Sequence, residues 1–448
     1  MLVSNTQATG ADVSQAEATR AFAKIGLLSF GGPAAQIAVM HRVLVDEKKW
    51  LSEKQFLHAL NFCMLLPGPE AMQLATYAGW LMHGVRGGVI AGLLFILPGL
   101  AMMLALASIF VAFGDVPLMA GIFYGLKAAV IAVVLQALIK VSGKALKTPA
   151  MYAVAAVAFI AIFFLRIPFP IIILGAALVG FLLWRAAPDL VPASTDDDEV
   201  EQQASVTGSP MEQTIRAVLV WGAIWLVPLA FLAFAMRGQF EQQAALFFSQ
   251  TAIVTFGGAY AVLAYVGQQA VEVYGWLTAA DMLKGLGLAE TTLGPLVLVL
   301  VFVGFVGGAN AAGTLAQLGG LSGGLIAAFF TFVPCFLWIF AGAPHMERLR
   351  HVRWLSASLV TVTAAVVGVI LNLAIWFGIA VLFGEPDYAQ TGFVWLPQIA
   401  LSSTDLVALV IAVASCVALL RFKVNLFVVL GAAAVAGLIA IFSGLAVA

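Results

Sequence analysis

Two short stretches decide the fold: KIGLLSFGGPAAQIAV at residues 24–39 and AIVTFGGAYAVLAYV at residues 252–266. Each stretch is apolar enough for a membrane, yet helix-breaking residues interrupt its centre, Gly31-Gly32-Pro33 in the first and Gly257-Gly258 in the second. Backbone that is released from helical hydrogen bonds is costly in hydrocarbon, so breaks are tolerated only where protein buries them or where they line a wet cavity. The two stretches therefore predict a buried site inside a membrane protein.

The composition is that of a membrane protein. Of the 448 residues, 63% are hydrophobic and 10% are charged, against about 25% charged in a typical soluble domain. Apolar runs of about 20 residues, the length that crosses a bilayer, recur along the whole chain and leave no soluble catalytic domain. The first twenty residues lack the features of a cleaved signal peptide, so we expect the first segment to be retained. Cys63, Cys335 and Cys416 lie in apolar runs without metal-ligand or redox spacing, so we expect no disulfide framework.

The chain contains an internal repeat. At one offset of 226 residues the matched positions are Phe30-Gly31-Gly32 with Phe256-Gly257-Gly258, Trp50 with Trp276, and Gly68-Pro69 with Gly294-Pro295. After a short insertion in the second copy, Pro98 meets Pro334 at an offset of 236 residues. We expect a first transport repeat at 1–190, an acidic solvated linker at 191–213, an extra inverting transmembrane helix at 214–240 and a second transport repeat at 241–448.

The number of spans between the copies predicts their relative orientation. Six apolar runs in the first half and one more at 215–236 make the second copy start an odd number of segments after the first. The second copy is then upside down, which is the inverted-repeat plan of secondary transporters. The predicted fold class is an all-α integral membrane protein, a polytopic helical bundle of about 12–13 membrane segments. We expect two inverted-topology repeats with broken or re-entrant helices.

The distribution of positive charges predicts whether the broken segments cross the membrane or turn back within it. If the N-terminus is cytoplasmic and every segment is a simple span, loop 41–54 lies outside although it carries Arg42, Lys48, Lys49 and Lys54, against the positive-inside rule. If the broken segments are re-entrant hairpins, this loop stays inside, and its counterpart 267–281, which has no Lys or Arg, moves outside. Charge bias therefore favours hairpins, and kinked through-helices joined by an interfacial segment are the alternative.

Four breaks in symmetric pairs indicate one site. They are Gly31-Gly32-Pro33, Pro67-Gly68-Pro69, Gly257-Gly258 and Gly294-Pro295. A helix that restarts after a break presents unpaired N–H groups and the positive end of its dipole, and glycine lets an oxygen-rich ligand approach the backbone closely. We therefore expect an anion as the ligand. The alternative is that glycine only permits close helix packing and proline only kinks the helix.

Polar side chains near the breaks are further candidates. His58 and Lys284 occupy equivalent positions and would add positive potential, unless they snorkel to the headgroups. Glu70 and Glu290 flank the second break of each half and are candidates for proton coupling, although Glu70 also suits a helix N-terminus. Lys127 is a charge within an apolar span, functional by default unless the span is shifted and it snorkels. Neutral candidates, for ligand binding or for contacts between helices, are Gln36, Asn61, Gln73, Thr291, Thr292 and Asn310.

These motifs resemble a known family. The stretch FGGPAAQIAVMHRVLVDEKKWLSEKQFLHALNFCMLLPGPEAMQLATYAGW is similar to the amino-terminal signature of the chromate ion transporter family. FGGAYAVLAY and WLTAADMLKGLGLAETTLGPL are similar to its second-domain signature. The resemblance covers nearly the whole chain in the long, two-domain form. The family motif residues are Phe30, Gly31, Gly32, Pro33, Trp50, Pro67, Gly68, Pro69, Phe256, Gly257, Gly258, Glu290, Thr291, Thr292, Gly294 and Pro295. Leu293 stands where the family pattern implies a proline.

The resemblance implies a protein of the bacterial inner membrane that exports chromate and confers chromate resistance. We expect a multi-pass protein whose N-terminus is cytoplasmic, because that orientation places most Lys and Arg residues inside. We expect alternating access, driven by membrane potential, proton antiport or both. Expelling a dianion gains about 4.6 kcal/mol per 100 mV, which supports roughly a 10³-fold gradient. Alternatives are a transporter of sulfate or another oxyanion, and an anion channel. We expect neither an enzyme nor a cofactor, since the five histidines form no metal motif, and no nucleic-acid partner; the lipid bilayer, a coupling proton and a second copy of the chain are the expected partners.

Overall fold

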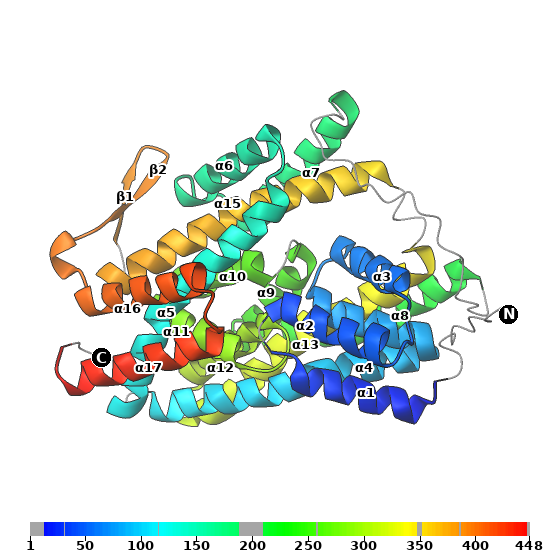
Figure 1. Ribbon diagram of the computed structural model, residues 1–448, viewed down its shortest axis with the longest axis horizontal. Helices are drawn as coiled ribbons and strands as arrows, with labels where there is room; N and C mark the ends of the chain where they lie inside the picture. The colour runs from blue at the N-terminus through cyan, green and yellow to red at the C-terminus, as the bar shows by residue number, and fades with distance from the viewer. Residues whose placement is uncertain are drawn as a thin grey trace.

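A computed structural model describes residues 13–30, 32–114, 116–187, 209–256, 259–346, 352–384 and 387–445. The described chain is almost entirely helical (Figure 1). Its α-helices are α1 Gln15–Leu28, α2 Gly32–His41, α3 Glu53–Leu65, α4 Glu70–Phe113, α5 Pro117–Ala145, α6 Pro149–Phe163, α7 Phe169–Ala186, α8 Pro210–Ala235, α9 Phe240–Val254, α10 Ala259–Gln268, α11 Ala279–Thr291, α12 Val299–Ala312, α13 Ala316–Gly342, α15 Arg353–Phe383, α16 Leu406–Cys416 and α17 Leu426–Phe442. Six helical stretches within the described residues are long and apolar enough to cross a membrane. The predicted class, an all-α polytopic membrane protein, is confirmed.

The first broken segment is a helical hairpin. Glu17, near the start of α1, lies 2.7 Å from Lys48, and Lys24 lies 3.1 Å from Glu47, beyond the end of α2. A straight helix over this length would separate its ends by about 45 Å at 1.5 Å per residue. The chain therefore turns back on itself between Leu28 and Gly32.

The second broken segment also turns back. The rings of Phe62 in α3 and Tyr77 in α4 lie 5.4 Å apart on either side of the break at residues 66–69. The α4 helix then reverses at His83 and Gly84, which have non-helical dihedral angles, so it comprises a return arm at 70–82 and a long arm at 85–113. The two arms pack closely through Gly79. A capping box at Ser52 fixes the start of α3.

The second half repeats this path. The rings of Phe240 and Trp276 lie 5.0 Å apart, which brings the start of α9 next to the residues beyond α10. Gly285 of α11 packs against Phe302 of α12, and α12 lies against α13 through Gly304. The second half therefore folds back on itself as the first half does.

The two halves meet along α4 and α13. Gly88 packs against Phe340 near one end of this contact, while the Ser108 hydroxyl donates to the Gln317 side chain over 2.7 Å near the other end. These helices are equivalent in the repeat, and they lie side by side and antiparallel. Each hairpin has an open end opposite its break. The open ends of the first-half hairpins lie at the Gly88 end of the contact between α4 and α13, and those of the second-half hairpins lie at the Ser108 end.

The remaining helices surround this centre. The long helix α15 runs beside α6 and α7 (Figure 1), and α17 packs closely on α5 where Gly437 meets Gly121 and Gly125. The extra helix α8 spans Pro210–Ala235, so it begins within the expected linker, most of which lies outside the described residues. The helix itself was expected at 214–240.

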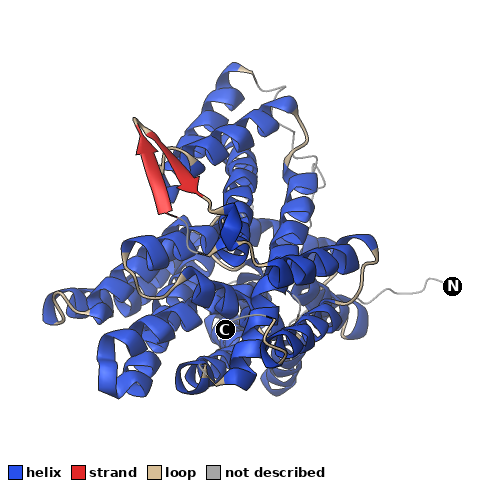
Figure 2. Cartoon of the chain, turned by 90° about the vertical axis from the view of Figure 1, so that its left-hand side faces the viewer, coloured by secondary structure: helices blue, strands red, loops and turns tan. Residues whose placement is uncertain are grey.

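A β-hairpin was missed by the sequence analysis. Strands β1 Asp387–Thr391 and β2 Val394–Gln398 pair antiparallel beyond the end of α15 (Figure 2). Gly392 turns the hairpin with φ of 65°. Ten strand residues in a connection between two apolar runs give too short a pattern to stand out, and they leave the all-α class unchanged.

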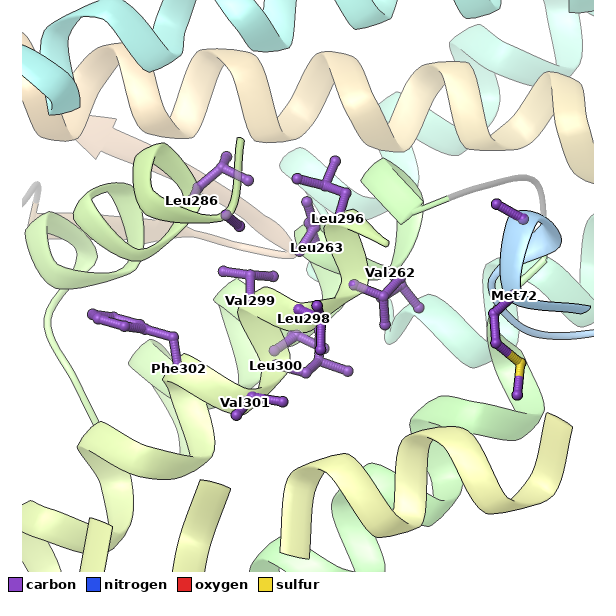
Figure 3. Close-up of a cluster of buried hydrophobic side chains, with 14 of the residues drawn as sticks. Met72, Val262, Leu263, Leu286, Leu296, Leu298, Val299, Leu300, Val301 and Phe302 are labelled. Atoms are coloured by element: carbon purple, nitrogen blue, oxygen red, sulfur yellow. The ribbon is translucent and has the colours of Figure 1, made fainter. Parts of the chain in front are cut away.

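Buried apolar side chains surround the breaks of the second half. Figure 3 shows Met72 of α4, Val262 and Leu263 of α10, Leu286 of α11 and Leu296 beyond the break among the side chains that fill this region. All five are at most 2% exposed. The interrupted backbone at residues 292–295 is therefore enclosed by protein, as the cost of unpaired peptide groups in hydrocarbon requires.

Candidate functional site

The breaks of the two halves are hydrogen-bonded to each other. The Gly68 amide donates to the Thr255 carbonyl over 2.8 Å, and the Gly294 amide donates to the Ser29 carbonyl over 2.9 Å. The two hydrogen bonds are equivalent under the offset of 226 residues. Each joins the second break of one half to the end of the helix before the first break of the other half. We call the described residues 29–30, 32–33, 66–69, 255–256 and 292–295 the crossed breaks.

Backbone conformation favours glycine at both Gly68 and Gly294, and lack of space favours it at Gly68 as well. Gly68 has φ of 126° and Gly294 has φ of 79°, where a side chain is disfavoured. A Cβ atom at Gly68 would lie 2.8 Å from the sulfur of Cys335, and one at Gly294 would lie 3.6 Å from the Cα of Gly99. Gly99 and Cys335 each follow a matched proline of α4 or α13. The second breaks therefore rest on equivalent positions of the two central helices.

Helices restart at the crossed breaks without side-chain caps. Pro69 precedes α4 and Pro295 precedes the 3₁₀ turn Leu296–Leu298 that leads into α12, and neither makes a side-chain hydrogen bond to its helix. The first turns therefore present N–H groups and the positive ends of their dipoles. This is the geometry that binds an anion.

Two glutamine amides lie at the second breaks. The Gln36 side chain, on α2, donates through Nε2 to the Gly294 carbonyl, and the Gln73 side chain, on α4, donates through Nε2 to the Pro67 carbonyl over 2.7 Å. Both side chains are fully buried. The Ser29 and Thr255 hydroxyls each donate to the carbonyl four residues earlier, which satisfies both at the ends of α1 and α9.

Glu290 is buried beside the second half's break. It is 3% exposed, and the Tyr260 hydroxyl donates to its Oε1 over 2.7 Å. The neighbouring Thr291 and Thr292 hydroxyls donate to carbonyls within α11, at Leu288 and Ala289. Their protons are therefore used inside the helix. Tyr260 was missed by the sequence analysis because a tyrosine near the start of an apolar segment gives no signal of a carboxylate partner.

Two predicted membrane charges belong to one cluster. Lys284 lies 3.0 Å from Asp281, and Lys127 lies over the Tyr124 ring, 4.8 Å from its centre. The Tyr124 hydroxyl donates to Asp405 over 2.6 Å, and electrostatic interactions link Lys127 to Asp405 and to Lys284. Asp281 forms an ion pair with Lys284, whereas Lys127 packs over the ring of Tyr124, whose hydroxyl is bonded to Asp405. No sequence signal joined Tyr124 and Asp405, which are far apart in the chain.

The other predicted residues lie as follows. Glu70 is the first residue of α4, partly buried, with Lys144 acting on it electrostatically. Phe30 packs edge-on against Phe427, at 5.9 Å between ring centres. Asn310 donates to the Trp276 carbonyl at the far end of α12, away from the breaks.

The remaining predicted positions are in or near the same hairpins. The crossed breaks themselves contain Gly32, Pro33, Pro67, Phe256 and Pro295, and His58 and Asn61 lie on α3. Gly31, Gly257 and Gly258 lie outside the described residues.

The best-formed cavities lie away from the crossed breaks. One, of about 20 Å³, is lined by Arg166, Glu272 and Tyr388, and the other, of about 10 Å³, lies between Gln15 and His83. Each has room for about one water molecule. Burial raises the pKa of Glu272, and Arg166, 3.8 Å away, opposes this. Neither cavity is large enough for a tetrahedral oxyanion, so the break geometry is the better guide to the site. Among the described residues no group of His, Cys, Asp or Glu is arranged to hold a metal ion.

Comparison with known proteins identifies the family. The family model described as "Chromate transporter" matches residues 16–181 and 242–438. The chain is 32% identical over 369 residues to the chromate transport protein of Pseudomonas aeruginosa, covering 82% of this chain and 81% of that protein. It is 28% identical over 354 residues to the chromate transport protein of Cupriavidus metallidurans, covering 79% and 80%.

A third relative extends the comparison. The chain is 28% identical over 376 residues to the probable chromate transport protein of Synechococcus elongatus, covering 83% of this chain and 86% of that protein. No solved structure matches the chain. With several helices able to span a membrane and a family match over most of its length, this multi-pass membrane protein belongs to the chromate transporter family.

Proposed function

We propose that the protein is a secondary transporter that exports chromate from the cytoplasm and binds the oxyanion at the crossed breaks. The observation that carries this proposal is the matched pair of hydrogen bonds from Gly68 and Gly294 to the opposite halves. They bring uncapped helix starts of both halves onto the centre of the bundle. Three relatives of similar length are named for chromate transport.

Alternating access follows from the same arrangement. The equivalent helices α4 and α13 pack antiparallel, and the hairpins of the two halves open at opposite ends of their contact. This geometry supports two inverted repeats that exchange roles around a fixed site. In one state the first-half hairpins would expose the site, and in the other the second-half hairpins would.

Membrane potential is a sufficient driving force. Each negative charge that leaves a cell gains about 2.3 kcal/mol per 100 mV. Glu290, buried with Tyr260, and Glu70, at the start of α4, are the proposed carriers if a proton is exchanged. A carboxylate in such a place is typical of proton-coupled transporters.

Chromate uptake into everted membrane vesicles tests the function. We expect saturable uptake of radiolabelled chromate that an imposed inside-positive potential drives. Collapse of the pH gradient alone tests the proposed role of the two glutamates. If chromate uptake is unchanged when the pH gradient is collapsed, proton exchange is excluded. Uptake that rises without saturation would indicate a channel, and sulfate that displaces chromate with higher affinity would indicate a sulfate transporter.

The orientation predicts which loops react from each side. In a chain whose native cysteines are replaced, we expect an impermeant maleimide to label Val273→Cys in right-side-out vesicles and Lys54→Cys only in everted vesicles. Both positions are exposed, with Val273 at 63%. The reason is that loop 41–54 carries the positive charges that stay inside. Labelling of both positions from the same side would contradict the hairpin topology and the opposed halves.

A further inference from the structure

The glutamine amides at the crossed breaks each leave an acceptor unused. Because Nε2 of Gln36 donates to the Gly294 carbonyl and Nε2 of Gln73 donates to the Pro67 carbonyl, the amide oxygens face elsewhere. Both Oε1 atoms are buried and accept no hydrogen bond from the part of the chain that the structure describes. The orientations are fixed, since turning either amide over would place its oxygen against a carbonyl oxygen.

Such acceptors call for a donor. Buried polar atoms without partners are rare in folded proteins, and those that occur need an explanation. A fully ionised tetrahedral oxyanion cannot supply one, because all its oxygens are acceptors and would be repelled by the amide oxygens. An oxyanion that retains one proton can donate its O–H and still accept from backbone N–H groups with its other oxygens.

We propose that the crossed breaks bind chromate in its singly protonated form, hydrogen chromate, with the O–H donating to the amide oxygen of Gln36 or Gln73. The inference rests on the proposed function and specifies the substrate of the same site. The helix starts receive the unprotonated oxygens, and one amide acceptor lies at each second break. Both acceptors come from the first half, since their repeat equivalents are Val262 and Val299.

The proton provides a basis for selectivity. Chromate takes up a proton near neutral pH, whereas sulfate and selenate do so only in strong acid. A site that hydrogen-bonds a substrate O–H strongly rejects an analogue that lacks it, because its own polar groups are left unpaired. Selenate is close to chromate in size, so size alone would not separate these two ions. We expect the site to bind selenate about 10- to 100-fold more weakly than chromate, as measured by competition between the two ions.

The form that crosses also sets the charge moved. Hydrogen chromate carries one negative charge, so 100 mV supports about a 50-fold gradient, less than the dianion would reach. When no proton is exchanged, charge per transported chromium therefore distinguishes the two forms; exchange of one proton would add one charge to either form.

The experiment uses the full-length protein in proteoliposomes with equal pH on both sides and a potential set by a potassium gradient and valinomycin. Initial chromate flux at subsaturating total chromate is measured from mildly acidic to alkaline pH, together with charge per ion. We expect the flux to follow the hydrogen chromate fraction, falling about tenfold per pH unit at the alkaline end, with one charge per ion. Flux that is constant or rises with pH overturns the inference, and so do two charges per ion where uptake is insensitive to a pH gradient and no proton is exchanged.

Protonation of the protein's own side chains would also make the flux depend on pH, so a control ion is needed. The titratable side chains at the crossed breaks and on the helices packed there include Glu70 on α4, Tyr260 on α10, Glu290 on α11 and Cys335 on α13. Their protonation would act on selenate as well as on chromate, but selenate stays a dianion over this range. A selenate affinity with the same pH profile as chromate would therefore also overturn the inference.

Variants test whether the two glutamine acceptors cause the preference for chromate and the pH dependence of the flux. Gln36→Met with Gln73→Met keeps side-chain volume and removes both acceptors, and we expect it to narrow the preference for chromate over selenate at least tenfold and to flatten the pH profile. Gln317→Met is the matched control, because Gln317 is exposed and is hydrogen-bonded to Ser108 far from the breaks. This variant should retain both the preference for chromate over selenate and the pH profile. An unchanged preference in the double variant counts against the inference. Absence of saturable chromate flux at every pH in the unmodified protein would instead contradict the proposed function.

Discussion

Replacement of Gly294 by valine is expected to abolish chromate export, by about 100-fold or more, while the protein still reaches the membrane. Gly294 has φ of 79°, which a β-branched residue adopts only at a cost of about 1–3 kcal/mol. The new side chain would also press on Leu298, whose Cδ1 would lie 3.0 Å from the Cβ atom. The backbone would then leave the position from which its amide binds the Ser29 carbonyl. Gly68→Val should behave alike, because its Cβ atom would meet Cys335 and Gln73.

A glycine of the same backbone conformation separates strain from site geometry. Gly238, between α8 and α9, has φ of 76°, and a Cβ atom there would meet nothing within 4 Å. Gly238→Val should therefore carry similar strain and export chromate at near the normal rate. Initial uptake rates in everted vesicles, divided by the amount of protein in the membrane, make the comparison. Normal export by both Gly294→Val and Gly68→Val would exclude the crossed breaks as the binding site.

The second large effect concerns the folding of the outer helices. A Cβ atom at Gly437 in α17 would lie 2.8 Å from the Cα of Gly125 in α5, so Gly437→Leu cannot fit without separating the helices. Overpacking of this kind costs typically about 1–3 kcal/mol, and close approach through small residues is what drives helix association in membranes. We expect a drop of several degrees in the thermal stability of the detergent-solubilised protein. Export should fall as well, because α17 carries Phe427, which packs on Phe30 beside the first break.

The matched control lies on the same helix. Gly431 also belongs to α17, but a Cβ atom there would meet nothing within 4 Å. Gly431→Leu adds the same side chain to the same helix, facing open space, and should leave stability unchanged. Thermal unfolding followed by size-exclusion chromatography measures both variants. Equal stability of the two would mean that α17 does not pack on α5 as described.

Much of the site could be predicted from local chemistry. Glycine and proline in apolar runs specify where helices stop: α1 ends at Leu28, α2 begins at Gly32, and further interruptions lie at residues 66–69 and 292–295. Paired positive charges in loop 41–54 favoured hairpins, and the contact of Lys48 with Glu17 shows the first one. These features can be predicted from the sequence because each depends on residues that are close together in the chain.

Other features depended on contacts between distant residues. The sequence could not show that Lys127 shares a cluster with Tyr124 and Asp405, because apolar helices look alike whichever neighbour they pack against. It could not show that Gln36 would bond the Gly294 carbonyl and leave its oxygen without a donor. The β-hairpin beyond α15 was missed for a similar reason, since Trp395 is held by the Phe164 carbonyl of a remote loop.

The sequence by itself determined the breaks, the repeat that relates them and the membrane environment that makes broken backbone costly. Only the tertiary structure decided which break meets which, through the bonds from Gly68 to Thr255 and from Gly294 to Ser29. The physical reason is that breaking a helix is a local property of backbone and side chain. The partner that satisfies the freed peptide group is chosen by the packing of α4 against α13, which no single segment encodes.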